Sequence, residues 1–525
     1  MPEVMIYDTT LRDGAAREGV SFSLEDKVKI LKHLDSFGVH YVEGGYPASN
    51  PKDQEFFDAA SGIELKNARL AAFGSTRRAV TSASRDKEMK ALVASGVKTA
   101  TIFGKSWDLH VETALRISLD ENLYMVEDSV RFLKNKGMEV LFDAEHFFDA
   151  YKENPVYALK VLEAAATGGA DWLVLCDTNG GSLPHEVARI VGEVREKVTV
   201  PLGIHAHNDC NCAVANSILA VREGATMVQG TINGYGERCG NADLCSVIPN
   251  LVLKMDVDCV GREKLAGLTE LAHFVSEVAN LTPDSHQPYV GMSAFAHKGG
   301  MHVSAISKES RTYEHIRPEA VGNIQRIVVS ELSGKSTLIM KAKEMGVDLT
   351  DDPATLADIL KEIKQLEHVG YQFEAADGSF EILVKKSLGT HRHFFRLESF
   401  RVIMEKREDG RVMTEATVKI HVGGKRLIAT AEGNGPVNAL DRALRLAIGR
   451  SYPALSDIEL TDYKVRVLDE KKGTAAVTRV LIETSDGEKS WGTVGVSENI
   501  IEASWQALVD SIEYGLEHRK RKAGD

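Results

Sequence analysis

The chain has 525 residues, 43% of them apolar, and a formal net charge of −13. That length and apolar content allow two or three domains with separate cores. The acidic excess argues against nucleic acid or an anionic membrane surface as the main partner. No run approaches the ~20 consecutive apolar residues of a membrane span, and the first residues lack the pattern of a signal peptide. We therefore expect a cytoplasmic protein whose six scattered cysteines are reduced thiols.

Up to about residue 260, short apolar segments alternate with longer amphipathic ones. The apolar segments cover residues 4–10, 41–47, 68–75, 99–106, 139–147, 172–180, 201–208 and 227–234. Between the first two, Leu24, Val28, Leu31 and Leu34 have helical spacing, and Gly38 follows as a stop signal. Eight strand–helix units over roughly 250 residues predict a (β/α)₈ barrel. A doubly wound sheet would need a glycine-rich phosphate turn after its first strand, where this chain has "DTTLRDG".

Polar side chains follow the first, seventh and eighth predicted strands. His205 and His207 alternate along an extended segment, so both should point to the same side. Asp13 follows the first strand and Asn241 follows the eighth. In a closed barrel these strands are neighbours, and the chemistry lies at their carboxyl ends.

Two imidazoles, a carboxylate and an amide oxygen suit a six-coordinate divalent ion. We expect Mn²⁺ or Mg²⁺, with Zn²⁺ and Co²⁺ as alternatives. A His-x-His pair alone is more often structural, so the prediction depends on the barrel topology and on the flanking Asp13 and Asn241.

Four motifs carry a family resemblance. "DTTLRDG", "GIHAHND", "NGYGERCGN" and "HKGGMHVSA" occur in the order found in the α-isopropylmalate synthase family, which includes homocitrate and citramalate synthases and is related to hydroxymethylglutaryl-CoA lyase. The resemblance covers nearly the whole chain. Three further segments, "EGVSFSLEDK", "EGGYPASNPKD" and "FDAEHFFDAY", are most similar to the long citramalate synthases. One departure is Ala16, which stands where the family usually has a glutamine.

The resemblance implies a reaction and roles for named residues. The family condenses acetyl-CoA with a 2-oxo acid and hydrolyses the thioester; here pyruvate would give citramalate for threonine-independent isoleucine biosynthesis. Arg12 resembles the arginine that stabilises the developing oxyanion, and Glu145 the acidic residue implicated in proton abstraction. Thr178 is placed to bind the substrate carboxylate. His302 and Tyr313 match a linker that reaches the active site, often that of the partner subunit.

Selectivity for pyruvate over larger 2-oxo acids would be steric. Phe73 and Phe103, at the ends of predicted strands, could narrow the pocket, although both also suit an ordinary core. Asp143, two residues before Glu145, would suit neither an apolar pocket nor an anionic ligand.

The C-terminal third has a different pattern. The pattern expected for three strands followed by a helix occurs twice after residue 390, which predicts a pseudo-twofold α+β domain. Uncovered sheet edges make a homodimer plausible. By resemblance this is a regulatory domain that binds isoleucine; the alternative is a purely dimer-forming module. We predict a catalytic barrel at 1–265, a helical linker carrying His302 and Tyr313 at 266–390, and the regulatory domain at 391–519.

Other functions stay open at this point. Isopropylmalate and homocitrate synthases are the nearest enzyme alternatives, and a carbon–carbon lyase is a weaker one because lyases of this kind usually lack the double repeat. A non-enzymatic amino-acid sensor with a degenerate barrel is the alternative from another class. The complete set of Arg12, Asp13, His205, His207 and Asn241 argues against it.

Overall fold

The computed structural model describes residues 3–329, 334–344, 346, 349, 353–469, 473 and 475–522. The chain divides into two compact units. The first comprises the residues up to 295 together with 315–325, and the second comprises 296–314 and the chain from 326 onward. The domain boundaries given above stay predictions.

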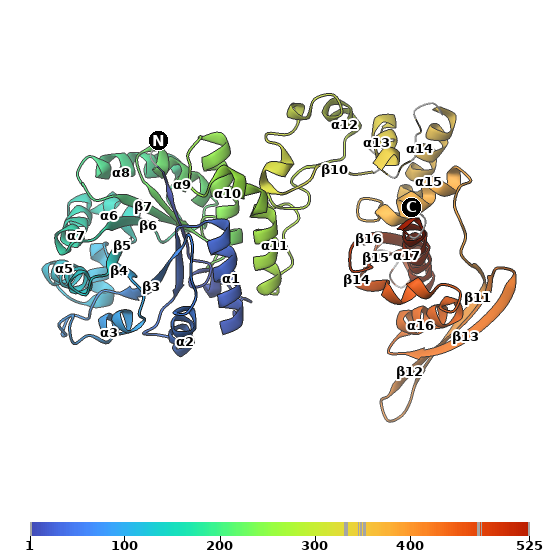
Figure 1. Cartoon of the computed structure of the whole chain (residues 1–525), viewed down its shortest axis with the longest axis horizontal. Helices are drawn as coiled ribbons and strands as arrows, with labels where there is room; N and C mark the ends of the chain where they lie inside the picture. Colours follow the sequence, from blue (N-terminus) through green and yellow to red (C-terminus); the bar gives the residue numbers. More distant parts are fainter. Residues whose placement is uncertain are drawn as a thin grey trace. The chain divides into compact units, whose positions relative to one another are not determined.

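The first unit is built on a closed barrel of eight parallel strands, which confirms the predicted fold (Figure 1). The strands are β1 Met5–Asp8, β2 Tyr41–Gly45, β3 Arg69–Ser75, β4 Thr99–Lys105, β5 Glu139–Glu145, β6 Trp172–Asp177, β7 Leu202–Ala206 and β8 Met227–Gly230. They follow one another around the barrel in chain order, and β1 pairs with β8 in parallel to close it. The carboxyl ends of β1, β7 and β8 are therefore neighbours, as the metal prediction requires.

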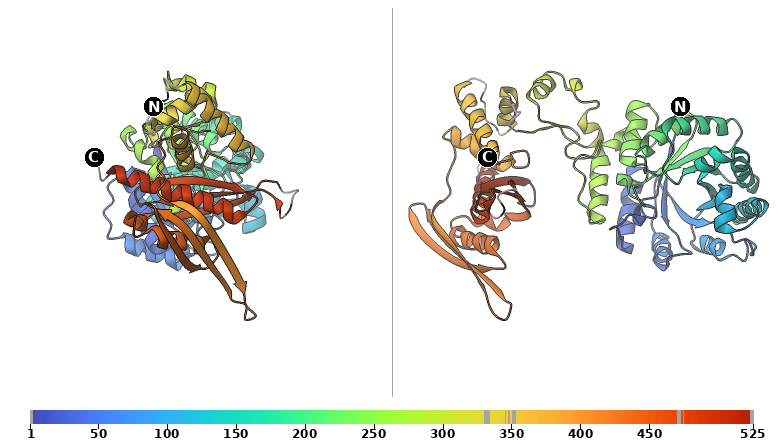
Figure 2. Two further views of the ribbon diagram at one scale, coloured as in Figure 1. Left: turned by 90° about the vertical axis from the view of Figure 1, so that its right-hand side faces the viewer. Right: turned by 180° about the vertical axis from the view of Figure 1, so that it is seen from behind.

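Helices surround the strands, as Figures 1 and 2 show. They are α1 Leu24–Phe37, α2 Pro51–Ala60, α3 Lys87–Ala94, α4 Asp108–His110, α5 Leu119–Asn135, α6 Phe147–Glu153, α7 Pro155–Gly168, α8 Pro184–Arg195, α9 Ala213–Arg222, α10 Leu244–Pro249 and α11 Leu268–Val278. The first helix begins at a capping box between Ser23 and Asp26, and ends at Gly38 with φ 98°. Leu31 and Leu34 on this helix are fully buried against the barrel.

Short 3-10 and π-helical segments complete the first unit and continue into the second. They are η1 Gly14–Ala16, η2 Val111–Leu115, η3 Ile232–Gly234, η4 Asn250–Lys254, η5 Arg262–Gly267, η6 Ser310–Thr312, η7 Pro318–Val321 and η8 Pro453–Asp457. All six cysteines of the chain are free thiols. Among the described helices, none is long and apolar enough to cross a membrane.

The second unit begins with short strands and helices. These are β9 Ala296–His297, α12 Gly300–Ile306, β10 Arg326–Ile327, α13 Lys335–Glu344, α14 Pro353–His368 and α15 Asp377–Ser387. Leu338, Ile359 and Val384 form an apolar cluster that also includes Val494 from the C-terminal repeat. The helices before residue 390 therefore share a core with the strands that follow.

The C-terminal repeat has the predicted order of strand, strand, strand and helix, twice. The first copy is β11 Arg396–Lys406, β12 Val412–Val422, β13 Lys425–Gly433 and α16 Pro436–Ile448; the second is β14 Glu459–Val467, β15 Thr478–Ser485, β16 Ser490–Ser497 and α17 Ile500–Lys522. Each set of strands forms an antiparallel sheet. Alternate strand residues such as Val418, Ile420, Val480 and Ile482 are buried beneath the helices.

Candidate active site

Three of the predicted metal ligands meet at one corner of the barrel. His205 Nε2 lies 3.4 Å, and His207 Nε2 3.9 Å, from Asp13 Oδ2. The two Nε2 atoms are 3.3 Å apart. All three side chains are buried, and their donor atoms lie within 4.8 Å of one another. This is a spacing that one divalent cation can bridge.

The fourth predicted ligand, Asn241, is held beside His207 by backbone pairing. The two residues form an isolated antiparallel bridge, and the N–H of Ala242 donates to the carbonyl oxygen of Ala206 at 2.9 Å. Asn241 Nδ2 donates to the carbonyl oxygen of Tyr235. Its Oδ1 is buried and has no hydrogen-bond partner among the described residues. A buried amide oxygen without a donor fits a metal ligand, because leaving it unpaired would otherwise be costly.

The loop that carries Asn241 turns tightly, and glycine permits the turns. Gly236 and Gly240 have φ values of 154° and 91°. A Cβ atom at Gly240 would collide with the carbonyl oxygen of Gly234, and one at Gly236 with the Asn241 side chain. The glycines of "NGYGERCGN" therefore shape the ligand loop through their backbone conformation.

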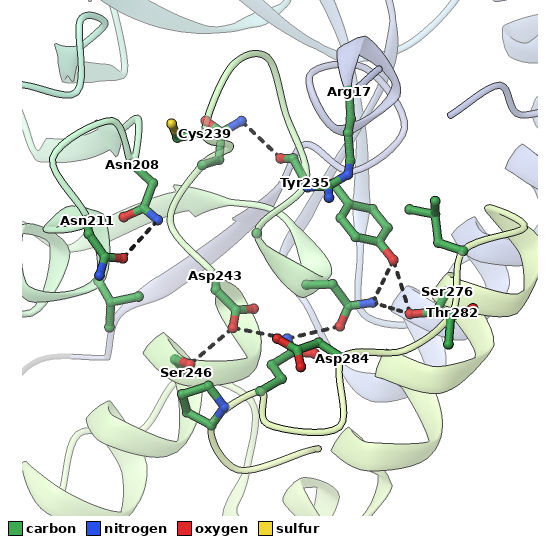
Figure 3. A pocket seen from close by; sticks show the side chains of 17 residues that line it. Arg17, Asn208, Asn211, Tyr235, Cys239, Asp243, Ser246, Ser276, Thr282 and Asp284 are labelled. Carbon is green, nitrogen blue, oxygen red and sulfur yellow. Dashed lines mark hydrogen bonds between the residues drawn. The ribbon is translucent and has the colours of Figure 1, made fainter. Parts of the chain in front are cut away.

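A polar cavity of about 440 Å³ lies behind this loop (Figure 3). Asp243 accepts hydrogen bonds from Ser246 Oγ and from Gln287 Nε2, each at 3.1 Å. Gln287 also donates to Asn233, which in turn donates to Ser276 on α11. The network anchors the loop to α10 and α11 from its far side, and so fixes the position of Asn241.

The protonation states of Asp13 and His207 suit metal ligands. Burial alone would raise the pKa of Asp13. Arg12 and His205 lower that pKa by more than burial raises it, so the group stays a carboxylate. Burial and the neighbouring His205 lower the pKa of His207 to about 3. His207 is therefore a neutral imidazole at neutral pH, which is the form that binds a metal.

A second layer behind the histidines was not predicted. His205 Nδ1 lies 2.9 Å from Gln229 Oε1, and Gln229 Nε2 donates to Asp143 at 3.0 Å. This arrangement places the proton of His205 on Nδ1 and turns Nε2 toward Asp13. Burial, together with the charge of Glu43, raises the pKa of Asp143 to about 7. The sequence feature that could have indicated this second layer is a glutamine, Gln229, within the wholly buried strand β8.

Arg12 is fixed by a buried carboxylate that was also missed. Its Nε is ion-paired with Glu43 Oε1, and its guanidinium lies 3.8 Å from the centre of the Phe73 ring. Glu43 is completely buried and also accepts hydrogen bonds from the hydroxyls of Tyr7 and Thr9. Burial lowers the pKa of Arg12, but Glu43 raises it more, so the guanidinium remains charged.

The remaining predicted residues of the barrel lie at the ends of β4, β5 and β6. Glu145 is ion-paired with Lys105. The Thr178 hydroxyl oxygen accepts a hydrogen bond from the His146 N–H at 2.8 Å, which leaves the hydroxyl proton for another acceptor. The ring of Phe103 stacks on Phe73, with 5.4 Å between centroids.

His302 and Tyr313 belong to the second unit. Their rings stack with 4.1 Å between centroids, and both residues are exposed. The structure thus pairs the two residues, while their predicted role at the barrel site stays a prediction.

Comparisons with known proteins cover almost the entire chain. Residues 3–275 match the HMGL-like family, 289–370 a homocitrate synthase post-HMGL domain, and 374–516 the LeuA allosteric (dimerisation) domain. An (R)-citramalate synthase of Geobacter sulfurreducens is 57% identical over 98% of both chains. One from Aquifex aeolicus is 55% identical, again over 98% of both chains. A probable 2-isopropylmalate synthase of Methanopyrus kandleri is 33% identical over 99% of this chain and 100% of its own.

Proposed function

Because this chain belongs to the HMGL-like family and, along nearly its whole length, to the (R)-citramalate synthases within it, we propose that it condenses acetyl-CoA with pyruvate to give (R)-citramalate and CoA. It is an acyltransferase of amino-acid biosynthesis. The observation that carries the choice of pyruvate is the similarity to five (R)-citramalate synthases at 46–57% identity. The 2-isopropylmalate synthases to which it is similar share 33% and 31%.

Asp13, His205, His207 and Asn241 would hold the metal, for which we favour Mn²⁺ or Mg²⁺. When bound, such an ion polarises the ketone of a chelated 2-oxo acid. Arg12, held in position by Glu43, would stabilise the enolate oxygen of acetyl-CoA as charge develops. Glu145, which is ion-paired with Lys105, would accept the methyl proton. Thr178 would donate its hydroxyl proton to the substrate carboxylate.

His302 and Tyr313 would act in the second half of the reaction. Thioester hydrolysis needs an activated water and a proton for the departing thiolate. An exposed imidazole stacked on a phenol ring can exchange protons with bulk water and keep a defined orientation. The two residues would approach the barrel of their own or of a partner subunit in a homodimer.

Phe73 and Phe103 would restrict the oxo acid to a small side chain. Their stacked rings lie at the ends of β3 and β4, next to the guanidinium of Arg12. Each methylene changes binding by only ~1–3 kcal/mol, so a rigid aromatic wall would contribute by exclusion as well as by contact.

The experiment is thiol release from acetyl-CoA with pyruvate, 2-oxobutyrate, 2-oxoisovalerate and 2-oxoglutarate in turn. We expect the highest kcat/KM with pyruvate, by about tenfold or more over 2-oxoisovalerate, and (R)-citramalate as the product on chiral chromatography. Greater activity with 2-oxoisovalerate would assign the chain to isopropylmalate synthesis instead. A metal titration of the chelated enzyme in the same assay ranks the candidate ions.

Isoleucine is the proposed effector, acting on a cytoplasmic homodimer. Two observations support this proposal: the match to an allosteric domain, and a cavity of about 710 Å³ at the start of α16. The cavity wall includes Tyr463, whose ring could contact an apolar side chain, and an Arg445–Asp441 ion pair, whose charged groups could meet those of an amino acid. Truncation near residue 390 should abolish inhibition by isoleucine, because no differential binding remains. It would also expose Val384, which packs in a cluster with Val494.

A point variant avoids that damage. Leu460→Trp would fill the cavity from its wall, and we expect it to lose isoleucine inhibition while retaining condensation activity. Leu446→Trp is the matched control, since Leu446 is 64% exposed on α16 and does not line the cavity. Unchanged inhibition in both the truncated chain and Leu460→Trp would place the effector site elsewhere.

A further inference from the structure

The second unit contains a cluster of metal-binding side chains that is separate from the barrel. His391 and His393 precede β11, and Glu513 lies on α17. His391 Nε2 is 3.0 Å from Glu513 Oε2, and His393 Nδ1 is 3.7 Å from Glu513 Oε1. One donor atom from each residue lies within 4.8 Å of the others. The two imidazoles therefore flank one carboxylate, each facing a different oxygen.

The carboxylate of Glu513 is buried without a permanent positive charge. The Glu513 and His391 side chains are 2% and 3% exposed, whereas His393 is 69% exposed. Among the described residues, the ion-pair partners of Glu513 are these two histidines. A buried carboxylate needs a compensating charge. His391 Nδ1 is also buried, with no hydrogen-bond partner among the described residues.

The nearby lysines pair with other carboxylates. Lys385 is ion-paired with Glu381 at 2.6 Å and with Glu517 at 2.9 Å. Lys386 lies 3.7 Å from Asp510, one turn before Glu513 on α17. Asp510 is close enough to Glu513 and His391 for their charges to interact. These lysines are therefore paired with carboxylates other than Glu513.

We propose that His391, His393 and Glu513 form a second metal site, for Zn²⁺ or a similar divalent transition metal. Metal–nitrogen and metal–oxygen bonds of about 2.0–2.2 Å in a tetrahedron separate the ligand atoms by roughly 3.3–3.6 Å. This range falls between the measured histidine–Glu513 distances of 3.0 and 3.7 Å. Two imidazoles favour Zn²⁺, Co²⁺, Ni²⁺ or Cu²⁺ over Mg²⁺ and Ca²⁺. The exposure of His393 leaves a position for water.

A metal at this site would join the segment that follows α15 to the helix α17. The first of these elements leads from the linker helices into the repeat, and the second ends the repeat. Occupancy would stabilise the second unit by mass action. The site is independent of the proposed condensation chemistry.

The test counts metal ions bound to the full-length chain. The double substitution His205→Ala with His207→Ala removes the barrel imidazoles, so the remaining binding reports on the second unit. After chelation and dialysis, this chain is equilibrated with Co²⁺, and bound ions are measured by elemental analysis and by visible absorption. We expect about one ion per chain, and loss of binding, by tenfold or more in affinity, on adding His393→Ala. In the wild-type barrel the same substitution should lower the stoichiometry from two to one.

His421→Ala is the matched control, because His421 is also a surface histidine paired with a glutamate, Glu398. It should leave Co²⁺ binding unchanged. The proposal would be overturned if the barrel variant bound no ion and the chain with the wild-type barrel bound only one. Retention of the second ion with unchanged affinity in His393→Ala would also overturn it. Neither readout depends on enzyme activity, so a failure of the proposed function would be seen separately in the thiol-release assay.

Discussion

Two His-x-His segments of this chain have the same spacing and different surroundings. In the barrel, His205 and His207 are both buried, face Asp13, and are supported by a second layer that includes Gln229. In the second unit, His391 is buried but His393 is largely exposed. The spacing directs both imidazoles of a pair to one side. The fold supplies a carboxylate to each pair and decides how far water reaches it, so the two proposed metal sites should differ in how readily an ion exchanges.

The largest effect should follow from breaking the barrel site itself. His207→Ala removes one of its two imidazoles, so we expect kcat/KM for thiol release to fall by more than about 100-fold. The circular dichroism spectrum should be unchanged, because the barrel core lies elsewhere. Near wild-type turnover after chelation and metal titration would refute the ligand assignment.

The second layer is the next difference to test. Gln229→Met keeps the side-chain size but removes the partner of His205 Nδ1, so the barrel's metal affinity should fall about 10–100-fold. Metal binding at His391 and His393 should not change. Competition with a chromophoric chelator measures both affinities.

Asn216→Leu is the control for Gln229→Met, because Asn216 is a buried amide of the barrel that donates to the Ser182 carbonyl. It should reduce stability without changing metal affinity. Equal losses of affinity in the two variants would mean that Gln229 acts only through general stability.

The smallest expected effect concerns carboxyl groups of the two units. Burial raises the pKa of Asp8 to about 7 against the opposing hydrogen bonds from Thr10. The folded state therefore binds a proton that the unfolded state has released, and this stability is lost as pH rises from about 4 through 7. Asp8→Asn does not lose this stability as the pH rises. The melting temperature of Asp8→Asn minus that of the wild type should therefore increase from pH 5 to pH 8. Each kcal/mol corresponds to about 2–4 °C.

Glu398→Gln in the second unit should show no such trend with pH. A hydrogen bond from Arg426 lowers the pKa of Glu398 to about 2. The contribution of this carboxylate to the free energy of unfolding is present above the ordinary glutamate pKa, and it is lost only as the pH falls toward 2. Between pH 5 and pH 8 the difference in melting temperature from wild type should therefore stay constant. Differential scanning calorimetry at fixed ionic strength measures both variants, and a constant difference for Asp8→Asn would contradict its raised pKa.

Much of the barrel could be predicted because its strands are short apolar runs and its closure makes distant residues neighbours. Asp13, His205, His207 and Asn241 followed from that topology, since each lies at the carboxyl end of a strand or in the loop that follows it. The supporting residues Glu43 and Gln229 did not follow, because a polar side chain in a buried strand does not identify its partner. Both contacts depend on side chains pointing into the barrel interior from different strands.

The second unit was less accessible to sequence reasoning. The double repeat was visible as alternating strands followed by helices. The sequence analysis did not single out His391 and His393, because their proposed third ligand, Glu513, lies about 120 residues further along the chain. His302 was singled out only through the family resemblance, since a histidine in a glycine-rich loop has no pattern of its own.

The closure of β1 on β8 has a consequence for synthesis. Met5 pairs with Met227, so the first strand lacks one neighbour until about 220 more residues have been translated. At ~5–20 residues per second this takes roughly 10–45 s. During that interval the nascent chain presents an apolar strand with an unpaired edge, a surface to which chaperones bind. Asp13 likewise meets His205 and His207 only near the end of barrel synthesis, so the proposed metal site could form only after nearly the whole barrel has left the ribosome.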